Sequence, residues 1–588
     1  MAIFSPNRLS GTLKTWARTG NPWVWLTAGA VSLSLVMVFG ILSLIASNGL
    51  RHFRAAAVAQ ITFAEGAGAP LLGEIVDRES VTAVRAREAG GRVPADATMV
   101  ERFLIKRGNR DIGGEDFRWI NAPDIQTLDY PADAYTVERL EWGNLYGRIK
   151  TLQEGGTSVP LVELQPRLAR VVALRADIDH LERIAIGGTN YALDALHRRE
   201  KAQRKAGATP ATLASLAAEE KALAARYAGF TAELEAKNVA ISRDRLRLET
   251  IEGETREVPL AKVVRAYAPN QMSLRQHVVH YGASLWEFLS AQPREANTEG
   301  GVFPAIFGTV LMVVMMSILV TPLGVITAVY LHEYAKPGAV TSAIRIAVNN
   351  LAGVPSVVYG VFGFGFFVYL VGGSVDRAFF AEALPSPTFG TPGLLWSSLT
   401  LSLLTVPVVI VATEEGLSRI PRAIREGSLA LGATKAETLW RMVLPMATPA
   451  MITGLILAVA RAAGEVAPLM LVGVVKLAPT LPLDGNFPFL HLDRKFMHLG
   501  FHIYDVGFQS PNVEAARPLV YSTALLLVII IMSLNLAAIR LRNRLREKYH
   551  AAEEPAANAR SAKPRPAGRN TAAGGPGPAA APGYAGGA

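Results

Sequence analysis

Six long stretches with almost no charge most limit what this chain can fold into. They lie at residues 22–50, 302–331, 349–373, 393–413, 449–475 and 518–538. Each is long enough to supply the roughly 20 apolar residues that cross the hydrocarbon of a bilayer. A soluble protein would carry about a quarter charged residues, whereas this chain carries 18% and is 50% hydrophobic. The pattern predicts a polytopic membrane protein with six transmembrane helices.

The distribution of positive charge predicts how the spans are oriented, because Lys and Arg near span ends favour the cytoplasmic side. Arg8, Lys14 and Arg18 precede the first stretch, and no small-residue cleavage site follows it. We therefore expect residues 1–21 inside and residues 22–50 as a retained anchor. Alternation through six spans then places residues 51–298 outside and both the loop 414–448 and the tail inside. The tail opens with Arg540, Arg542, Arg544, Arg546 and Lys548.

Two counts exclude other chemistries. The chain contains no cysteine, so it has no disulfide, thiolate nucleophile or cysteine-ligated metal. Its net charge of +10 does not indicate nucleic-acid binding, because the basic residues gather at the ends of apolar stretches, as membrane topology predicts. We therefore expect membrane lipid, and not nucleic acid, around this chain.

The extracytoplasmic segment 51–298 is expected to be an α+β domain. Residues 57–160 alternate apolar and polar side chains in short runs broken by turns, which predicts a β-rich unit. Residues 163–240 carry apolar side chains at helical spacing. We expect a long helical hairpin there, followed by a strand pair around Gly253.

The two arms of the hairpin are separated by the break at residues 206–210, which supplies a turn, an N-cap Thr209 and a first helical Pro210. No cluster of histidines or carboxylates in the domain indicates a metal or catalytic site, and we expect no cofactor. Residues 546–588, rich in alanine, proline and glycine, are expected to form a disordered cytoplasmic tail.

The loop 414–448 carries the motif that indicates the class of protein. It reads E-G-S from Glu426, three residues, Gly432, nine residues, then M-V-L-P ending in Leu444 and Pro445. This spacing resembles the coupling motif of ABC importer permeases, which is E-A-A, three residues, G, nine residues and I-x-L-P. We expect a short helix ended by Gly432, a second helix to Val443, and a change of direction at Leu444-Pro445. The alternative is an ordinary amphipathic loop.

The coupling motif implies partner chains. A compact helix pair of this kind, with Arg422 at its start, can sit in a groove of a soluble ATPase and transmit its motion. The chain has no G-x-x-x-x-G-K-[ST] phosphate-binding loop, so ATP hydrolysis belongs on separate polypeptides and the chain itself is not expected to be an enzyme. The resemblance implies two ATP-binding subunits and a second permease. The glycines at 360–365 are in the wrong order for phosphate binding and indicate helix packing.

Two charged residues lie near the middle of the fifth apolar stretch, Arg461 and Glu465. A charge at that depth costs at least about 2.5–3.5 kcal/mol, so it normally faces water or a partner. The i, i+4 spacing puts both groups on one helix face, where they can pair. The arginine fork suits an oxyanion, and the glutamate can hold that fork until a substrate displaces it. The alternative is an ion pair that only locks two helices together.

A closer family resemblance surrounds these two residues. Residues 460–469 read A-R-A-A-G-E-V-A-P-L, which resembles the A-R-A-x-G-E-T-A-P-L stretch of phosphate permeases of PstA type. Val466 departs from the usual threonine. Residues 300–306 and 353–360 also resemble the family's entries into its core spans. The resemblance covers about 295 to 545, and implies a type I ABC importer permease core over 299–545.

The resemblance also implies a function and a setting. Arg461 and Glu465 would take part in phosphate translocation, phosphate would arrive on an extracytoplasmic binding protein, and the chain would lie in the bacterial inner membrane. The second permease would be a related, non-identical chain. The resemblance does not cover the large segment 51–298.

Smaller features admit two interpretations each. Pro355-Ser356 either loosens the third span near the pathway or only kinks it. The charged residues of the loop 476–517 either meet a binding protein or are ordinary solvated loop charge, which we favour. They are His491, Asp493, Arg494, Lys495 and His498.

Two other functions are considered. The cargo could be another oxyanion, such as molybdate or sulfate, since charge alone does not separate these from phosphate. A membrane sensor that uses the helical hairpin is the second, but it has no use for a coupling loop or for five further spans. Residues 550–588 are also too poor in apolar residues to fold into a signalling domain.

Overall fold

The computed structural model describes residues 21–561 apart from 65–67, 89, 91, 95, 511 and 512. In this part of the chain six helices are long and apolar enough to cross a membrane, which confirms the predicted class. The six spans are Trp23–Arg51, Phe303–Tyr334, Ser356–Phe379, Leu394–Ser418, Lys435–Ala462 and Ala516–Arg544.

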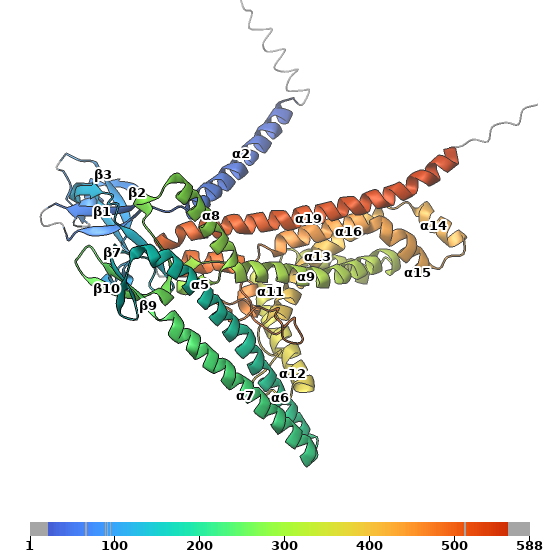
Figure 1. Cartoon of the computed structure of the whole chain (residues 1–588). Helices are drawn as coiled ribbons and strands as arrows, with labels where there is room; N and C mark the ends of the chain where they lie inside the picture. The colour runs from blue at the N-terminus through green and yellow to red at the C-terminus, as the bar shows by residue number, and fades with distance from the viewer. Residues whose placement is uncertain are drawn as a thin grey trace, which may run out of the picture.

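Three of the six spans in the described part of the chain contain more than one helical element. The elements are α2 (Asn21–Arg51); α9 (Phe303–Val329) with η7 (Tyr330–Tyr334); α11 (Ser356–Phe362), η8 (Gly363–Gly372) and α12 (Gly373–Phe379); α13 (Leu394–Ser418); α15 (Lys435–Thr438), η9 (Leu439–Val443) and α16 (Leu444–Ala462); and α19 (Val513–Ser561). The connecting elements are α10 (Ala339–Leu351), α14 (Arg422–Ala430), α17 (Leu469–Val472), α18 (Leu499–Tyr504) and η10 (Asp505–Gln509). Helices α9, α13, α16 and α19 lie side by side, with α14 and α15 at one end of the bundle (Figure 1).

Helix α13 is the centre of the bundle because it packs against both α9 and α16. Its Leu401 and Leu404 are buried with Met312 and Met316 of α9 in the largest apolar core. Close approach depends on glycine: a Cβ on Gly324 of α9 would lie 2.6 Å from the Val409 side chain.

The glycines of the third span confirm the packing role predicted for them. A Cβ on Gly360 would lie 2.7 Å from the Cα of Pro468, and one on Gly363 would lie 2.2 Å from the Thr400 hydroxyl. These glycines therefore bring the third span against α17 and α13. Pro355 lies at the N-cap of α11, so it starts this helix and neither loosens nor kinks it.

The segment between α2 and α9 forms two antiparallel sheets. The first has the order β4-β3-β2-β1-β5, and the second has the order β10-β9-β7-β6-β11 with β8 paired to β7. The strands are β1 (Val58–Phe63), β2 (Leu71–Thr82), β3 (Met99–Lys106), β4 (Phe117–Asn121), β5 (Ile125–Asp129), β6 (Tyr135–Arg139), β7 (Leu145–Glu154), β8 (Thr157–Val159), β9 (Asp244–Glu249), β10 (Thr255–Pro259) and β11 (Val263–Tyr267). Strands β9 and β10 are the predicted pair around Gly253, which has a φ of 83°.

Shorter elements complete this segment. They are α3 (Ala83–Glu88), α4 (Arg110–Gly113), α8 (Leu274–Ser290), the strand pair β12 (Pro293–Arg294) and β13 (Glu299–Gly300), and the 3-10 turns η1 (Ala122–Asp124), η2 (Leu161–Glu163), η4 (Leu260–Lys262), η5 (Pro269–Gln271) and η6 (Glu295–Asn297). Helix α8 starts with a capping box of Ser273 and Gln276 and leads the chain into α9.

The predicted helical hairpin is inserted between β8 and β9. One arm consists of α5 (Leu164–His180), η3 (Leu181–Ile186) and α6 (Gly187–Lys205), and the other is α7 (Pro210–Ile241). The Thr209 hydroxyl accepts from the Thr212 N–H at 3.4 Å, which confirms the predicted N-cap. Leu168 and Val171 at the base of the hairpin are buried against the second sheet.

The distal part of the hairpin contacts the membrane-spanning part of the chain. Lys201 donates to the carbonyls of Glu382 and Leu384 at 2.7 and 3.3 Å, in the loop between α12 and α13. Tyr191 makes an edge contact with His491, their ring centres 5.6 Å apart. The hairpin therefore runs from the sheets to lie beside α12 (Figure 1).

Three expected boundaries differ from the structure. The third span runs from Ser356 to Phe379, whereas the sequence indicated 349–373, because Pro355 starts its first helix. The fifth span begins at Lys435 and ends at Ala462, whereas the sequence indicated 449–475. Pro449 is accommodated inside the helix, and Gly464 and Pro468 end it early. A disordered tail was expected from residue 546, but helix α19 continues to Ser561. The alanines and glutamates of this stretch favour helix. The rest of that tail, 562–588, and residues 1–20 lie outside the described residues.

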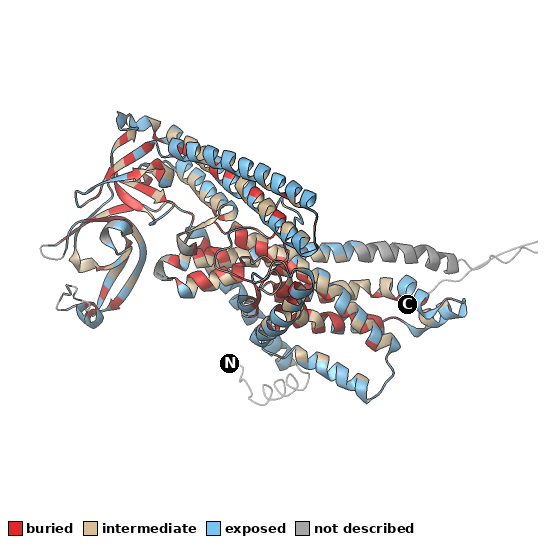
Figure 2. Cartoon of the chain, turned by 90° about the horizontal axis from the view of Figure 1, so that it is seen from below, coloured by how far each residue is buried: buried red, intermediate tan, exposed pale blue. Residues whose placement is uncertain are grey.

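Buried and exposed residues lie in different parts of the molecule. Buried residues run along the strands and through the middle of the bundle, while the hairpin and the outer faces of the spans are largely exposed (Figure 2). Helix α2 has no buried residue in its apolar window. It contacts α19 near its end, where the Ser522 hydroxyl donates to the Gly49 carbonyl at 2.8 Å. Lipid is the natural solvent for such exposed apolar faces.

Candidate functional site

Arg461 lies in the last turn of α16, and Glu465 lies just beyond the end of that helix. The sequence had placed both on one continuous helix face. The helix instead ends at Ala462, and the next backbone hydrogen bond, from the Glu465 N–H to the Ala462 carbonyl, belongs to a turn. The two side chains are nevertheless paired, with 3.8 Å between Arg461 Nε and Glu465 Oε1. The break gives Glu465 freedom that a residue inside a helix does not have.

The side chains of this pair are partly buried and partly accessible to solvent. The side chains of Arg461 and Glu465 are 34% and 21% exposed. A cation at the carboxyl end of a helix is stabilised by the helix dipole. Tyr359 of α11 lies within electrostatic reach of Arg461, and it packs in the same core as Val459 and Ala462. The backbone of the arginine is thus held by its helix, and the contact found for its guanidinium among the described residues is the one with Glu465 at 3.8 Å.

The predicted coupling residues form an exposed turn at the end of the bundle remote from the sheets (Figure 1). Helix α14 runs from Arg422 to Ala430, and Gly432 follows it with a φ of 88°, a left-handed conformation that favours glycine. Thr434 and Glu437 form a capping box that starts α15. Arg422, Glu426 and Gly432 are all exposed on this turn.

Leu444 and Pro445 do not redirect the chain as the sequence had suggested. Helices α15, η9 and α16 continue through them from Lys435 to Ala462. The π-helical segment η9 ends at Val443, two residues before Pro445, and accommodates the missing N–H of that proline. The structure therefore places these two residues inside a span, half-buried behind the turn that carries Gly432.

Sequence reasoning missed the contacts that hold this turn to the bundle. Arg425 Nη2 lies 3.0 Å from Glu333 Oε1 at the end of α9, and both side chains are largely buried. The same guanidinium donates to the carbonyls of Leu417 and Ile420, each at 2.8 Å. Lys435 also donates to the carbonyl of Glu333. Glu333 and Arg425 stand 92 positions apart in the sequence, and no local pattern indicated the pair.

A second missed pair joins α10 to α13. Arg345 Nη2 lies 3.3 Å from Glu414 Oε1 and donates to the Leu331 carbonyl at 3.0 Å. Together with Arg425, this arginine ties the ends of α9, α10 and α13 to the base of the exposed turn. Arg425 thus joins the turn to η7 and the end of α13, and Arg345 joins α10 to the same two segments.

The loop between α17 and α18 is not the solvated charge that the sequence favoured. His491 and His498 are buried, and Asp484 pairs with Arg494 at 2.5 Å and with His491 at 2.9 Å. Partial burial would raise the pKa of Asp484, but its hydrogen bonds from the Asn486 N–H, Arg494 and His491 lower it to about 2. Burial lowers the pKa of His498 to about 4. Of the five charged residues singled out in this loop, only Lys495 is fully exposed.

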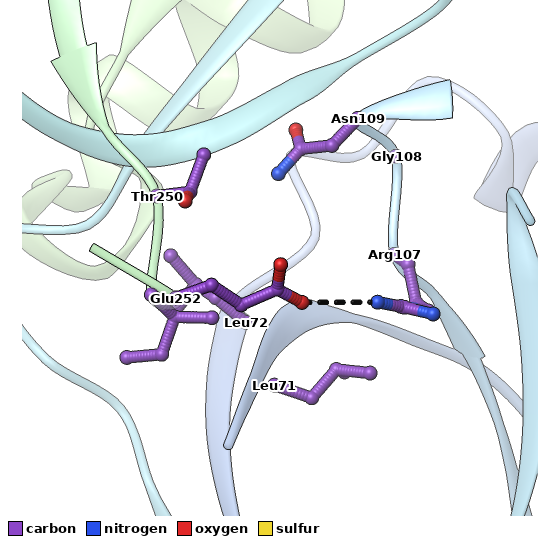
Figure 3. Close-up of a pocket in the computed structure, with 8 residues that line it drawn as sticks. Leu71, Leu72, Arg107, Gly108, Asn109, Thr250 and Glu252 are labelled. Carbon is purple, nitrogen blue, oxygen red and sulfur yellow. Dashed lines mark hydrogen bonds and ion pairs between the residues drawn. The ribbon is translucent and has the colours of Figure 1, made fainter. Parts of the chain in front are cut away.

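The sheets enclose a small cavity that is not a substrate site. It has a volume of about 20 Å³ and lies beside the ion pair of Arg107 and Glu252, whose closest atoms are 3.3 Å apart (Figure 3). That volume holds about one water molecule. Among the described residues there is no group of three or more His, Asp or Glu side chains that could hold a metal ion.

Comparison with known proteins places the site in a family context. The family model described as "Binding-protein-dependent transport system inner membrane component" matches residues 320–550. This match includes Arg461, Glu465 and the exposed turn of α14 and α15. The two sheets and the helical hairpin lie outside the matched segment.

Curated relatives match over a similar length. The phosphate transport system permease protein PstA 1 of Mycobacterium tuberculosis (strain CDC 1551 / Oshkosh) is 36% identical over 247 residues, which are 41% of this chain and 71% of that protein. PstA of Mycobacterium leprae is 37% identical over 239 residues, 40% of this chain and 69% of that protein. A solved structure of the MetNI methionine ABC transporter in inward-facing conformations is 18% identical, with a TM-score of 0.30, over 45% of this chain and 98% of that one.

Proposed function

This chain belongs to the PstA-type permeases of binding-protein-dependent transport systems, and from that premise we propose that it forms half of the membrane pathway of an ATP-driven phosphate importer. Permeases of this family are multi-pass inner-membrane components and not enzymes, and ATP hydrolysis belongs to a separate subunit. The second permease would be a related, non-identical chain, and an extracytoplasmic binding protein would deliver phosphate.

The observation that carries this proposal is the Arg461–Glu465 pair at the broken end of α16. Arg461 lies in the last turn of the fifth span and not at its middle, as the sequence had suggested. A guanidinium there still needs a partner, and its fork matches the oxygens of phosphate. Glu465 contacts the fork at only 3.8 Å and sits on a turn, so a phosphate can displace it without unwinding a helix. A half-exposed site of this kind binds weakly enough to release its anion.

The exposed turn of α14 and α15 would couple the pathway to ATP hydrolysis. Arg422, Glu426 and Gly432 present its outer surface, and an ATP-binding subunit would hold that surface. Closure of two such subunits would move the turn, and the buried Arg425–Glu333 contact would pass the motion to α9. Leu444 and Pro445 would carry it along the continuous helix through α16, whose last turn contains Arg461.

The proposed function also implies an orientation. The turn would face the cytoplasm together with both termini, and residues 51–298 would lie outside the membrane. The sheets lie at the end of the bundle opposite the turn (Figure 1), as the orientation requires.

The direct test is uptake of labelled phosphate at low external phosphate. Cells that lack this chain would be compared with cells in which the wild-type chain or Arg461→Ala is restored at matched membrane abundance. We expect the wild-type chain to restore uptake and Arg461→Ala to fail. Sulfate and molybdate, added in excess, should not compete.

The other results separate the alternatives. If the wild-type chain restores uptake of sulfate or molybdate and not of phosphate, the cargo is another oxyanion. If it restores no uptake but alters a response to external phosphate, the chain is a sensor. If Arg461→Ala transports as well as the wild type, the ion pair only locks the end of α16.

A further inference from the structure

An open cavity of about 410 Å³ lies between α10, α13 and α16, on the side of the bundle nearest the exposed turn. Its wall is largely apolar, with Val408, Val411 and Leu457 among the lining residues. Four polar side chains also line it: Asn349, Glu415, Arg419 and Thr453. It is about twenty times larger than the cavity between the sheets. A cavity that is mostly apolar with a few convergent polar groups is the usual form of a small-ligand site.

The cavity lies along the same helix that carries Arg461. Thr453, Leu457 and Arg461 follow one another at intervals of four along α16 and therefore lie on the same side of it. A second link runs through α11, because Tyr359, which Arg461 influences electrostatically, donates to the Leu351 carbonyl at 2.6 Å. Leu351 precedes the lining residue Ala352. Along α16 the cavity therefore lies between Arg461 and the exposed turn.

The charges at the cavity favour an anion. Arg419 lies at its edge, and Arg542 of α19 donates to the Thr453 hydroxyl at 3.5 Å. Glu415 is the opposing charge, and it is engaged with Arg419 at 3.7 Å. The Thr453 hydroxyl donates to the Pro449 carbonyl, and the amide of Asn349 is exposed. Both groups can donate to an oxyanion, the first by turning its hydroxyl away from the carbonyl.

We propose that this cavity is a second anion station, through which an inorganic oxyanion passes after it leaves Arg461. The proposal rests on the proposed function. Asn349 and Thr453 replace part of the hydration of the anion, and Arg419 supplies a weak counter-charge near the cytoplasmic end. The exposure of Arg419 and its pairing with Glu415 keep the station weak, which allows release.

The absence of cysteine from this chain makes the test direct. Thr453→Cys would be introduced into the assembled transporter in inside-out membrane vesicles. Its reaction with an anionic methanethiosulfonate would be compared with its reaction with a cationic one. The control is Met446→Cys, which is exposed on the same helix outside the cavity. The wild-type chain gives the background from thiols of the other subunits.

We expect the ratio of anionic to cationic reaction rates at Thr453→Cys to exceed that at Met446→Cys by at least about threefold, because the cavity concentrates anions. Inorganic phosphate should slow the reaction at Thr453→Cys and leave the control unchanged. Arg419→Gln should bring the two ratios together.

Two results would overturn the proposal. One is reaction of Thr453→Cys with a lipid-soluble maleimide but with neither charged reagent, which would make the cavity a lipid-filled groove. The other is a ratio equal to that of the control with no protection by phosphate. If the wild-type vesicles transport phosphate in either case, only the anion station is lost. If they transport none under any condition, the proposed function itself fails.

Discussion

Arg461 owes its position to a helix that stops, not to one that continues. At residue scale the carboxyl end of α16 supplies partial negative charge, and Glu465 supplies a full one from the turn beyond. A cation held from both sides keeps its fork oriented while remaining half-exposed.

The first prediction separates charge from shape at Arg461. We expect Arg461→Ala to reduce phosphate uptake by about 10–100-fold, the equivalent of about 1.5–3 kcal/mol for hydrogen bonds to a charged group. Arg461→Lys keeps the charge but loses the bidentate fork, so phosphate uptake by this variant should lie between that of the wild type and that of Arg461→Ala. Uptake against phosphate concentration, at matched membrane abundance, measures both effects.

Glu465→Gln serves as the counterpart of these variants. A glutamine holds the arginine less tightly, so phosphate should bind better and leave more slowly, which lowers both the half-saturating concentration and the maximal rate. A pair that only locks the structure would instead lower the abundance of all three variants and leave the half-saturating concentration unchanged.

The second prediction concerns Gly432. Its φ of 88° and the open space around it mean that an added Cβ meets no atom, so Gly432→Ala tests backbone strain alone. A left-handed alanine costs about 1–2 kcal/mol, which should loosen the turn and lower the phosphate imported per ATP hydrolysed. Gly427→Ala is the matched control, since Gly427 also has no atom within 4 Å but lies inside α14, where alanine favours helix.

At residue scale the sequence indicated candidate residues but not the partners that they contact. Arg461 and Glu465 were found because charges are rare in apolar stretches, and Gly432 because motif spacing is local information. The partners of Arg425 and Arg345 were missed, since a pair that spans tens of residues leaves no periodic signal. The burial of His491 and His498 was missed for the same reason. A loop rich in polar residues is expected to be solvated, and the distant residues that cover these two histidines leave no signal in the local sequence.

At the scale of elements, α18 is started by a buried histidine. The Gly500 N–H donates to Nδ1 of His498 at 3.1 Å, and burial lowers the pKa of His498 to about 4. Burial also lowers the pKa of His502 to about 4, with Asp505 acting against this shift and Lys476 adding to it. Between about pH 6.5 and 4 the unfolded chain binds protons that the folded chain excludes, so stability falls as the pH falls through this range.

The third prediction follows from that sign. His498→Asn keeps a cap acceptor for α18 but removes one titrating group. The apparent melting temperature of the purified complex should therefore fall less steeply between pH 7.5 and 5.5 than that of the wild type. Part of the slope remains, because His502 still titrates. The control is His180→Asn on the exposed face of the hairpin, and equal slopes for both variants would contradict the buried role of His498.

The hairpin gives the fourth prediction. Its base is part of the core of the second sheet, so only residues 187–230 should be replaced by a short glycine-rich turn. The shortened chain loses the contacts of Tyr191 and Lys201 with the loops beside α12 and α18. We expect it to insert normally but to need a several-fold higher concentration of the binding protein for half-maximal uptake.

Lys201→Ala, which keeps the hairpin but removes its hydrogen bonds to Glu382 and Leu384, should show a smaller effect in the same direction. If both variants transport like the wild type at every concentration of binding protein, and the response to external phosphate is also unchanged, the hairpin has no part in delivery or regulation.

Element types were predictable where the pattern is long and periodic. The six spans, the hairpin and its cap at Thr209 all follow from runs of ten or more residues. The ends of the fifth span were not predictable, because Pro445 and Pro449 indicated helix breaks whereas the helix accommodates both prolines. The completion of the second sheet by β9, β10 and β11 was only partly foreseen, since its strands lie on either side of a long insertion.

At the scale of the whole molecule, the two ends of the helix bundle carry different structural elements. One end has the sheets and the hairpin, and the other has the exposed turn of α14 and α15 (Figure 1). The positive charge of the sequence predicts which end faces the cytoplasm. The family assignment gives the same answer through the coupling turn, so charge and motif make one joint prediction of topology.

The fifth prediction tests this orientation with single cysteines, which the chain otherwise lacks. Ser215→Cys lies on the exposed face of α7 and Ala430→Cys lies at the exposed end of α14. In intact spheroplasts a membrane-impermeant maleimide should label Ser215→Cys at once and Ala430→Cys only after the membrane is opened. The reverse order would place the sheets in the cytoplasm. The coupling turn would then face away from any ATP-binding subunit. The topologies predicted from the positive charges and from the coupling motif would both be wrong.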